Sequence, residues 1–110
     1  MQVMYFVTAV WSPPSVPLLT LARGRLWLAK AQQRCGGFYD LLSNAVAAVE
    51  TNVGDLHGSN SDFVVIEQIV EGMPAAVEDS WWYGWDEERG YVLLDEPPTF
   101  ARQRLNWAFR

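Results

Sequence analysis

The residues of this chain with the clearest potential for chemistry are clustered aromatic side chains and arginines. A nucleotide ligand requires flat side chains on which its base can stack, and arginine or backbone donors for its phosphates. An asparagine, with both a donor and an acceptor, suits a base edge or a ribose. The candidate ligand-binding residues are Arg34, Trp82, Trp85, Arg102, Arg104, Asn106 and Trp107. Phe109 is a further stacking candidate, but the same aromatics are equally compatible with a core or an interface between subunits.

Catalytic motifs are missing. The sequence contains no GxGxxG after a strand and no GxxxxGK[ST], HExxH or GxSxG pattern. His57 is the only histidine and lies in a polar segment, which favours a solvated loop residue over a ligand. Cys35 is the only cysteine; we expect a small buried thiol, with an exposed nucleophile as the alternative. We therefore predict a protein that is not an enzyme and has no cofactor, metal or catalytic residue.

The carboxylates divide into paired and isolated positions. Three acidic pairs, at 78–79, 87–88 and 95–96, fall at predicted strand ends or turns, where charged pairs are usually solvated. Glu67 instead interrupts an apolar strand, so a buried carboxylate there needs a partner. The sequence favours a structural ion pair with Arg34 or an arginine near the C-terminus over a functional role.

Charge is distributed unevenly along the chain. Residues 1–39 carry +4, residues 40–96 carry −12 with all 13 acids, and residues 97–110 carry +3, for a net charge of −5. Basic ends that meet in the fold would form a local anion site on an acidic protein, although they could equally pair with the acidic middle. The net charge argues against nucleic-acid binding, while a carboxylate array that mimics nucleic acid stays open.

The elements that must position these residues follow from local patterns. The segment 3–11 is uncharged and rich in β-branched and aromatic residues, which predicts a strand buried on both faces, and 63–71 predicts a second, central strand. Residues 81–86 and 91–95 predict a hairpin with a turn at 86–90. Alternation places Trp82 on the face opposite Trp81, Tyr83 and Trp85. Residues 34–39 predict a short strand or turn.

One amphipathic helix is predicted by an apolar stripe that ends before Gly54, with Asp40 or Ser43 as its cap. The stripe is Leu42, Ala45, Val46, Val49 and Val53. Residues 17–34 predict a helix or a long arm, and the last dozen residues a short strand or an arm. The expected fold is a single α+β domain over residues 1–110. Its antiparallel sheet of about 4–5 strands is packed by one main helix, with aromatic-basic terminal arms.

The chain has no apolar run long enough to cross a bilayer and no recognisable secretion signal, so we expect a cytoplasmic protein without a membrane partner. Six tryptophans, four tyrosines and five phenylalanines in 110 residues are many for one small core. Some of this aromatic surface should stay exposed on a monomer, which predicts a homo-oligomer or a binding site.

Several motifs together resemble a family of small phage proteins. They are RCGGFY (34–39), AVETNVGDLH (48–57), FVVIEQIVEG (63–72), the 81–98 hairpin and LNWAF (105–109). The chain is similar to the anti-Thoeris sponges of the first anti-defence type. This resemblance implies an oligomer that sequesters a cyclic ADP-ribose isomer, in the infected bacterial host, without degrading it. It covers roughly residues 34–110 and does not reach residues 12–33.

Two hypotheses of function follow. The first is a viral counter-defence sponge, whose aromatic clamps stack on a cyclic nucleotide and whose arginines neutralise its pyrophosphate. The second is an acidic, protein-binding inhibitor, similar in action to an anti-CRISPR protein, whose acidic middle meets a basic surface.

Overall fold

The computed structural model describes most of the chain. It covers residues 2–11, 19–22, 25–28, 32–53, 55–58, 61–72, 76–103 and 106–108, of which 19–22, 25–28, 32, 76, 102 and 103 are described by backbone alone. The elements in chain order are β1 (Val3–Trp11), β2 (Leu19–Ala22), β3 (Arg25–Leu28), β4 (Gln32–Tyr39), α1 (Leu42–Glu50), β5 (Phe63–Val70), β6 (Ala76–Asp86), β7 (Gly90–Leu93) and the 3-10 helix η1 (Thr99–Gln103).

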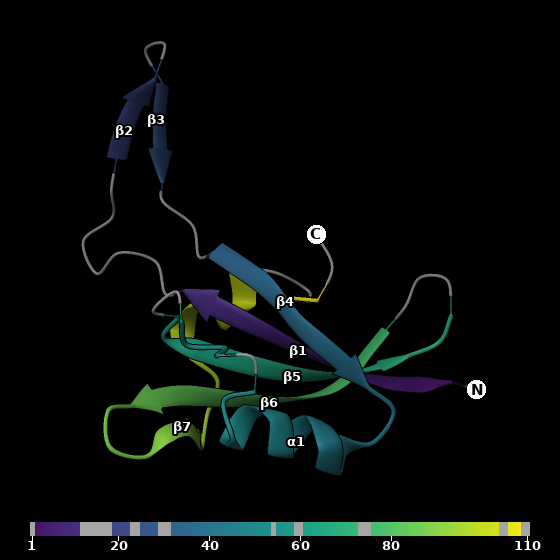
Figure 1. Cartoon of the computed structure of the whole chain (residues 1–110). Helices are drawn as coiled ribbons and strands as arrows, with labels where there is room; N and C mark the ends of the chain where they lie inside the picture. The colour runs from purple at the N-terminus through teal and green to yellow at the C-terminus, as the bar shows by residue number, and fades with distance from the viewer. Residues whose placement is uncertain are drawn as a thin grey trace.

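Five strands form one antiparallel sheet in the order β4-β1-β5-β6-β7, with α1 across one face (Figure 1). The predicted α+β architecture is therefore confirmed. β5 is the middle strand, as its apolar sequence predicts. β1 is buried on both faces, since consecutive residues from Val7 to Val10 are no more than 1% exposed.

The β6–β7 hairpin forms as predicted. The carboxylate of Asp86 accepts hydrogen bonds from the backbone N–H groups of Glu88 and Arg89, which shapes the turn. Gly90 closes it at φ +77°, a left-handed conformation that favours glycine. The expected alternation also holds, because Trp82 packs on one face of the sheet and Tyr83 on the other.

Helix α1 covers the first face. Ala45 and Val49 pack with Val7, Ile66 and Tyr83 into a continuous core. The helix ends at Glu50, so Val53 lies beyond it and is 51% exposed, contrary to the predicted stripe. The predicted caps are also wrong: Leu41 occupies the N-cap position, and no side chain caps the helix. Packing of the alanine and valine face, rather than capping, therefore stabilises α1.

The C-terminal segment covers part of the second face, which we call the arm face. Trp107 packs there with Val10, Val65 and Trp82, and Phe100 of η1 packs against this cluster. Of the two expectations for this segment, an arm is confirmed and a strand is not, since residues 99–103 form a 3-10 helix.

The backbone of residues 19–22 and 25–28 is extended, so the helix, one of the two expectations for residues 17–34, is wrong. β2 and β3 form a separate two-stranded antiparallel sheet, which stands apart from the main sheet in Figure 1. Alternating residues such as Leu19, Leu21, Leu26 and Leu28 satisfy the period of a strand as well as a loose helical one. In the described part of the chain, no helix is long and apolar enough to cross a membrane.

Candidate functional site

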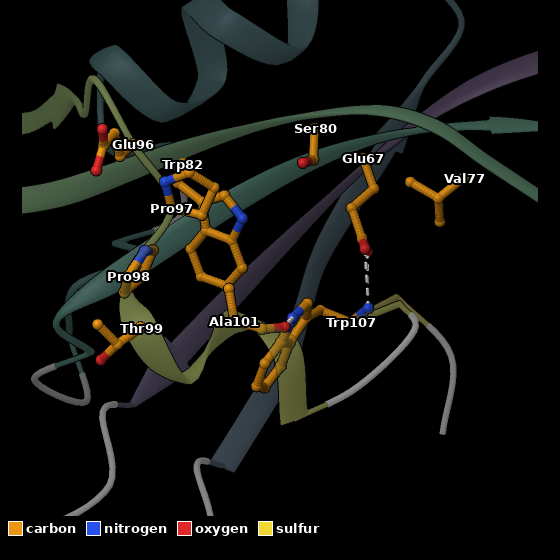
Figure 2. A pocket seen from close by; sticks show the side chains of 10 residues that line it. All are labelled: Glu67, Val77, Ser80, Trp82, Glu96, Pro97, Pro98, Thr99, Ala101 and Trp107. Atoms are coloured by element: carbon orange, nitrogen blue, oxygen red, sulfur yellow. Dashed lines mark hydrogen bonds between the residues drawn. The ribbon is translucent and has the colours of Figure 1, made fainter.

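A groove lies on the arm face of the described structure (Figure 2). Its volume is about 910 Å³. It lies between strands β5 and β6 on one side and the segment 96–101 on the other, with Trp107 at its base. The lining residues are Glu67, Val77, Ser80, Trp82, Glu96, Pro97, Pro98, Thr99, Ala101 and Trp107. A volume of this size lies in the range of small-molecule sites.

Glu67 anchors the C-terminal arm to the sheet. Its side chain is 2% exposed, and both carboxylate oxygens lie 2.9 Å from the backbone nitrogen of Trp107, which donates to them. The backbone N–H of Ala108 donates to Oε1 at 2.8 Å. Burial raises the pKa of Glu67 above its ordinary value of 4.5, against the opposing effect of these hydrogen bonds. The backbone N–H groups of Trp107 and Ala108 thus stabilise the negative charge of the Glu67 carboxylate.

Glu67 does not form the predicted ion pair with Arg34, and the side chains of the alternative partners, the arm arginines, lie outside the described residues. Arg34 is exposed on β4, where its guanidinium donates to the carbonyl oxygen of Leu56 at 3.4 Å. Register explains this, because Glu67 pairs with Phe6 while Arg34 pairs with Ala9, farther along β1. The only ion pair between described side chains joins Arg89 to Asp86 at 3.8 Å on the surface.

Two of the predicted site residues, Trp82 and Trp107, come together at the groove. Their ring centroids lie 5.7 Å apart with an interplanar angle of 87°, and Phe100 is edge-on to both. Trp82 is 5% exposed and Trp107 2%, so both rings are buried and make edge-to-face contacts with each other and with Phe100. The two tryptophans therefore line the groove as parts of the core and do not form the expected stacking clamp.

Trp85 lies on the opposite face of the sheet, so it cannot join Trp82 in one site. Its ring stacks on His57 with centroids 3.6 Å apart and planes 7° apart, and it meets Tyr91 edge-on at 5.0 Å. His57 Nδ1 lies 2.9 Å from the carbonyl oxygen of Ser61, to which it donates. His57 lies in a loop as predicted, but it is half-buried against Trp85 and Tyr91 rather than solvated. This histidine ties the loop after α1 to the β6–β7 hairpin.

Hydrogen bonds complete this second cluster. The hydroxyls of Ser61 and Tyr91 lie 2.7 Å apart, and the Tyr91 hydroxyl donates to the Ser61 carbonyl at 3.0 Å. Ser61 also donates to the carbonyl of Leu56 at 3.0 Å. Ser61 is completely buried and Tyr91 is 4% exposed, so the cluster is a structural support.

The other predicted site residues belong to the arm. Asn106 is half-buried beside Trp107. Arg102 lies in η1 next to the groove residue Ala101, with its side chain outside the described residues. Arg104 and Phe109 lie entirely outside them.

Sequence reasoning missed the role of the segment 96–98. The pair at 95–96 is exposed, as predicted, but Glu96 also lines the groove together with Pro97, Pro98 and Ser80. The paired prolines were the available signal, because their fixed backbone angles make the segment that lines the groove rigid. The described ionisable side chains of the groove are both acids, Glu67 and Glu96.

Cys35 is exposed on the edge strand β4, so the expected buried thiol is wrong. The acidic pairs at 78–79 and 87–88 are exposed, as predicted. Among the described residues, no group of histidine, cysteine and carboxylate side chains is arranged to hold a metal ion.

No protein-family model, curated protein or solved structure matches this chain.

Proposed function

We propose that this chain binds and sequesters a cyclic nucleotide, a cyclic ADP-ribose isomer, in the groove on the arm face without degrading it. In this proposal it acts as a phage counter-defence sponge in the cytoplasm of an infected bacterium and inhibits a Thoeris-like defence. The observation that carries the proposal is the position of the groove. Two of its lining residues, Ala101 and Trp107, bracket Arg102 and Arg104 in the chain.

The chemistry of the groove supports a nucleotide in one orientation. Pro97 and Pro98 offer apolar surface for a base, beside the edges of the buried tryptophan rings. The hydroxyl of Ser80 and the carboxylate of Glu96 are acceptors for ribose hydroxyls or a base amino group. A pyrophosphate would be repelled by Glu67 and Glu96, so in this proposal its charge is neutralised by Arg102 and Arg104, which the sequence places between the lining residues Ala101 and Trp107.

Calorimetric titration with cyclic ADP-ribose isomers tests this proposal. Binding in the micromolar range or tighter, with the ligand recovered chemically intact after heat denaturation, is the expected result. A complementary experiment purifies the protein from cells with an active nucleotide-signalling defence and measures its mass by native mass spectrometry. An empty protein from those cells and no heat of binding would reject the sponge, while a hydrolysed ligand would show an enzyme.

A second candidate function is inhibition of a basic protein partner. The observation in its favour is the distribution of acids: every acidic residue except Glu67 and Asp86 is exposed. Such a surface attracts a basic partner at long range, with an effect that salt screens. Co-purification with a defence effector that is lost in high salt would support this function, and its absence with each basic effector tested would count against it.

A further inference from the structure

Strand β6 has an edge that no other described strand covers. β7 pairs only with residues 83–86 of this strand. The backbone N–H of Leu94 extends the pairing by one hydrogen bond, to the Trp82 carbonyl at 2.8 Å. After Leu94 the chain leaves the sheet, so in the described part of the chain residues 76–81 have a neighbouring strand, β5, on one side only. We call the other side of residues 76–81 the free edge.

The backbone of Ser80 points out of the free edge. Successive residues of a strand direct their backbone groups to opposite sides, and the Trp82 carbonyl faces β7. The N–H and carbonyl of Ser80, two residues earlier, therefore face the free edge. This N–H donates to the side chain of its own neighbour, Asp79 Oδ1, at 2.8 Å. A local side chain thus takes the place that a strand neighbour would fill.

A small hollow lies where the chain leaves the free edge, and we call it the corner hollow. Its volume is about 190 Å³, below the range of about 300–1,000 Å³ typical of small-molecule pockets, so it suits a single side chain. Ser80 and Trp81 line it from β6, and Asp95 and Glu96 line it from the departing segment. A segment that pairs with the free edge can therefore place one side chain between these two carboxylates.

The described charges around the free edge are negative. Glu78 and Asp79 on β6 and Asp95 and Glu96 on the departing segment are all exposed. The described lining of the corner hollow contains no lysine or arginine. Charged side chains on a sheet edge discourage pairing with neutral or like-charged strands, while opposite charges on a partner favour its binding. The free edge therefore selects a basic segment.

We propose that the free edge of β6 binds an extended, basic segment of a protein partner, which adds to the sheet as a further strand. The backbone of this segment replaces Asp79 as the partner of the Ser80 N–H. One of its lysine or arginine side chains enters the corner hollow beside Asp95 and Glu96. The inference rests on the second candidate function, inhibition of a basic protein partner, and gives that function a site and a mode of binding.

A synthetic peptide tests the free edge. The probe is an acetylated and amidated hexapeptide of alternating valine and lysine, titrated into isotopically labelled protein and followed by NMR. We expect a saturable change in the amide resonances of residues 78–82, with slower hydrogen exchange at the Ser80 N–H. The same peptide methylated at every backbone nitrogen keeps its charges but cannot donate in a strand ladder, so it should not protect Ser80. Equal binding and equal protection by the two peptides would overturn strand pairing.

Matched charge variants test the corner hollow. Asp95→Asn combined with Glu96→Gln should weaken binding of the valine–lysine peptide about fivefold, the effect expected for two exposed ion pairs. Glu87→Gln combined with Glu88→Gln removes the same charge at the β6–β7 turn and should leave the affinity nearly unchanged. Amide spectra away from the altered residues show whether each variant is folded. An equal loss of affinity in the two double variants would mean general attraction to an acidic protein and would reject the hollow.

The outcomes separate this site from the function on which it rests. Changes in amide resonances confined to other surfaces would reject the free edge and leave the second candidate function standing. No response to the peptide at millimolar concentration would reject the free edge as a binding site. Failure of the candidate function reads differently, because then no basic effector co-purifies with the protein, whether or not the peptide protects Ser80.

Discussion

The backbone nitrogen of Trp107 donates to both carboxylate oxygens of Glu67 at 2.9 Å, which joins the C-terminal arm to the central strand across 40 residues of sequence. The side-chain amide of Gln33 donates to the carbonyl of the same tryptophan, and the indole N–H of Trp107 donates to Ala101 at 3.3 Å. The groove therefore depends on a buried carboxylate that holds its base in place.

Removal of this carboxylate should loosen the arm. In Glu67→Ala the N–H groups of Trp107 and Ala108 lose their acceptor, and an unsatisfied buried donor costs about 1–3 kcal/mol. We expect the free energy of unfolding in urea to fall by about this amount, with a red-shifted tryptophan emission as Trp107 meets water. The control is Glu78→Ala at an exposed position of β6. An unchanged emission and stability for Glu67→Ala would show that Glu67 does not hold the arm.

The stability should depend on pH through the same residue. Because burial raises the folded pKa of Glu67 above 4.5, the folded protein binds its proton more tightly than the unfolded chain does. The stabilisation from Glu67 is therefore complete below pH 4.5 and is lost as the pH rises through the folded pKa. Unfolding measured against Glu67→Gln, which does not titrate, isolates this effect. The wild type should lose stability relative to the variant across that window, and a relative gain would contradict the assignment.

The stack of His57 on Trp85 should stabilise the loop after α1. An aromatic pair contributes about 0.5–1.5 kcal/mol beyond its buried area. We expect His57→Ala to lose the stack and the hydrogen bond to Ser61, and His57→Phe to lose only the hydrogen bond. The free energy of unfolding should thus decrease in the order wild type, His57→Phe, His57→Ala. Equal values for the two variants would mean that the stack contributes nothing.

Ligand binding should depend on the arm arginines. Each charge-assisted hydrogen bond contributes about 1.5–3 kcal/mol, so loss of Arg102 or Arg104 should weaken the affinity about tenfold to a hundredfold. Titration calorimetry of the single and double alanine variants with a cyclic ADP-ribose isomer measures this. Arg89→Ala in the β6–β7 turn is the control for a general loss of positive charge. Trp85→Phe, on the helix side of the sheet, should also bind normally, and equal weakening in all variants would remove the groove as the site.

Much of the fold was accessible from local patterns. β1 and β5 follow from long apolar, β-branched runs, and the β6–β7 hairpin follows from alternation and a turn that ends in glycine. The helix pattern located α1 but placed its end too late, because Val53 satisfies the period without reaching the core. The helix alternative for residues 17–34 was wrong at 19–22 and 25–28, because a short apolar segment with alternating leucines fits both the strand period and the helix period.

The candidate site was less accessible because its contacts join distant segments. The alternation of side chains along a strand was enough to place Trp82 and Trp85 on opposite faces of the sheet. The sequence also identified the C-terminal arm as a basic and aromatic segment. The sequence did not show that Trp82 and Trp107 are buried in edge-to-face contacts with each other and with Phe100, or that His57 stacks on Trp85.

The sequence by itself therefore determined β1, β5, the β6–β7 hairpin, the helix and which aromatics share a face, since these depend on short periods of apolar and polar residues. Only the tertiary structure decided the partners of the isolated polar groups. The sequence already shows that Glu67 interrupts an apolar strand. That its carboxylate accepts hydrogen bonds from the N–H groups of Trp107 and Ala108 depends on the path of the arm across the sheet, which only the tertiary structure gives. Backbone donors carry no signature of residue type, so a pattern of side chains could not reveal them.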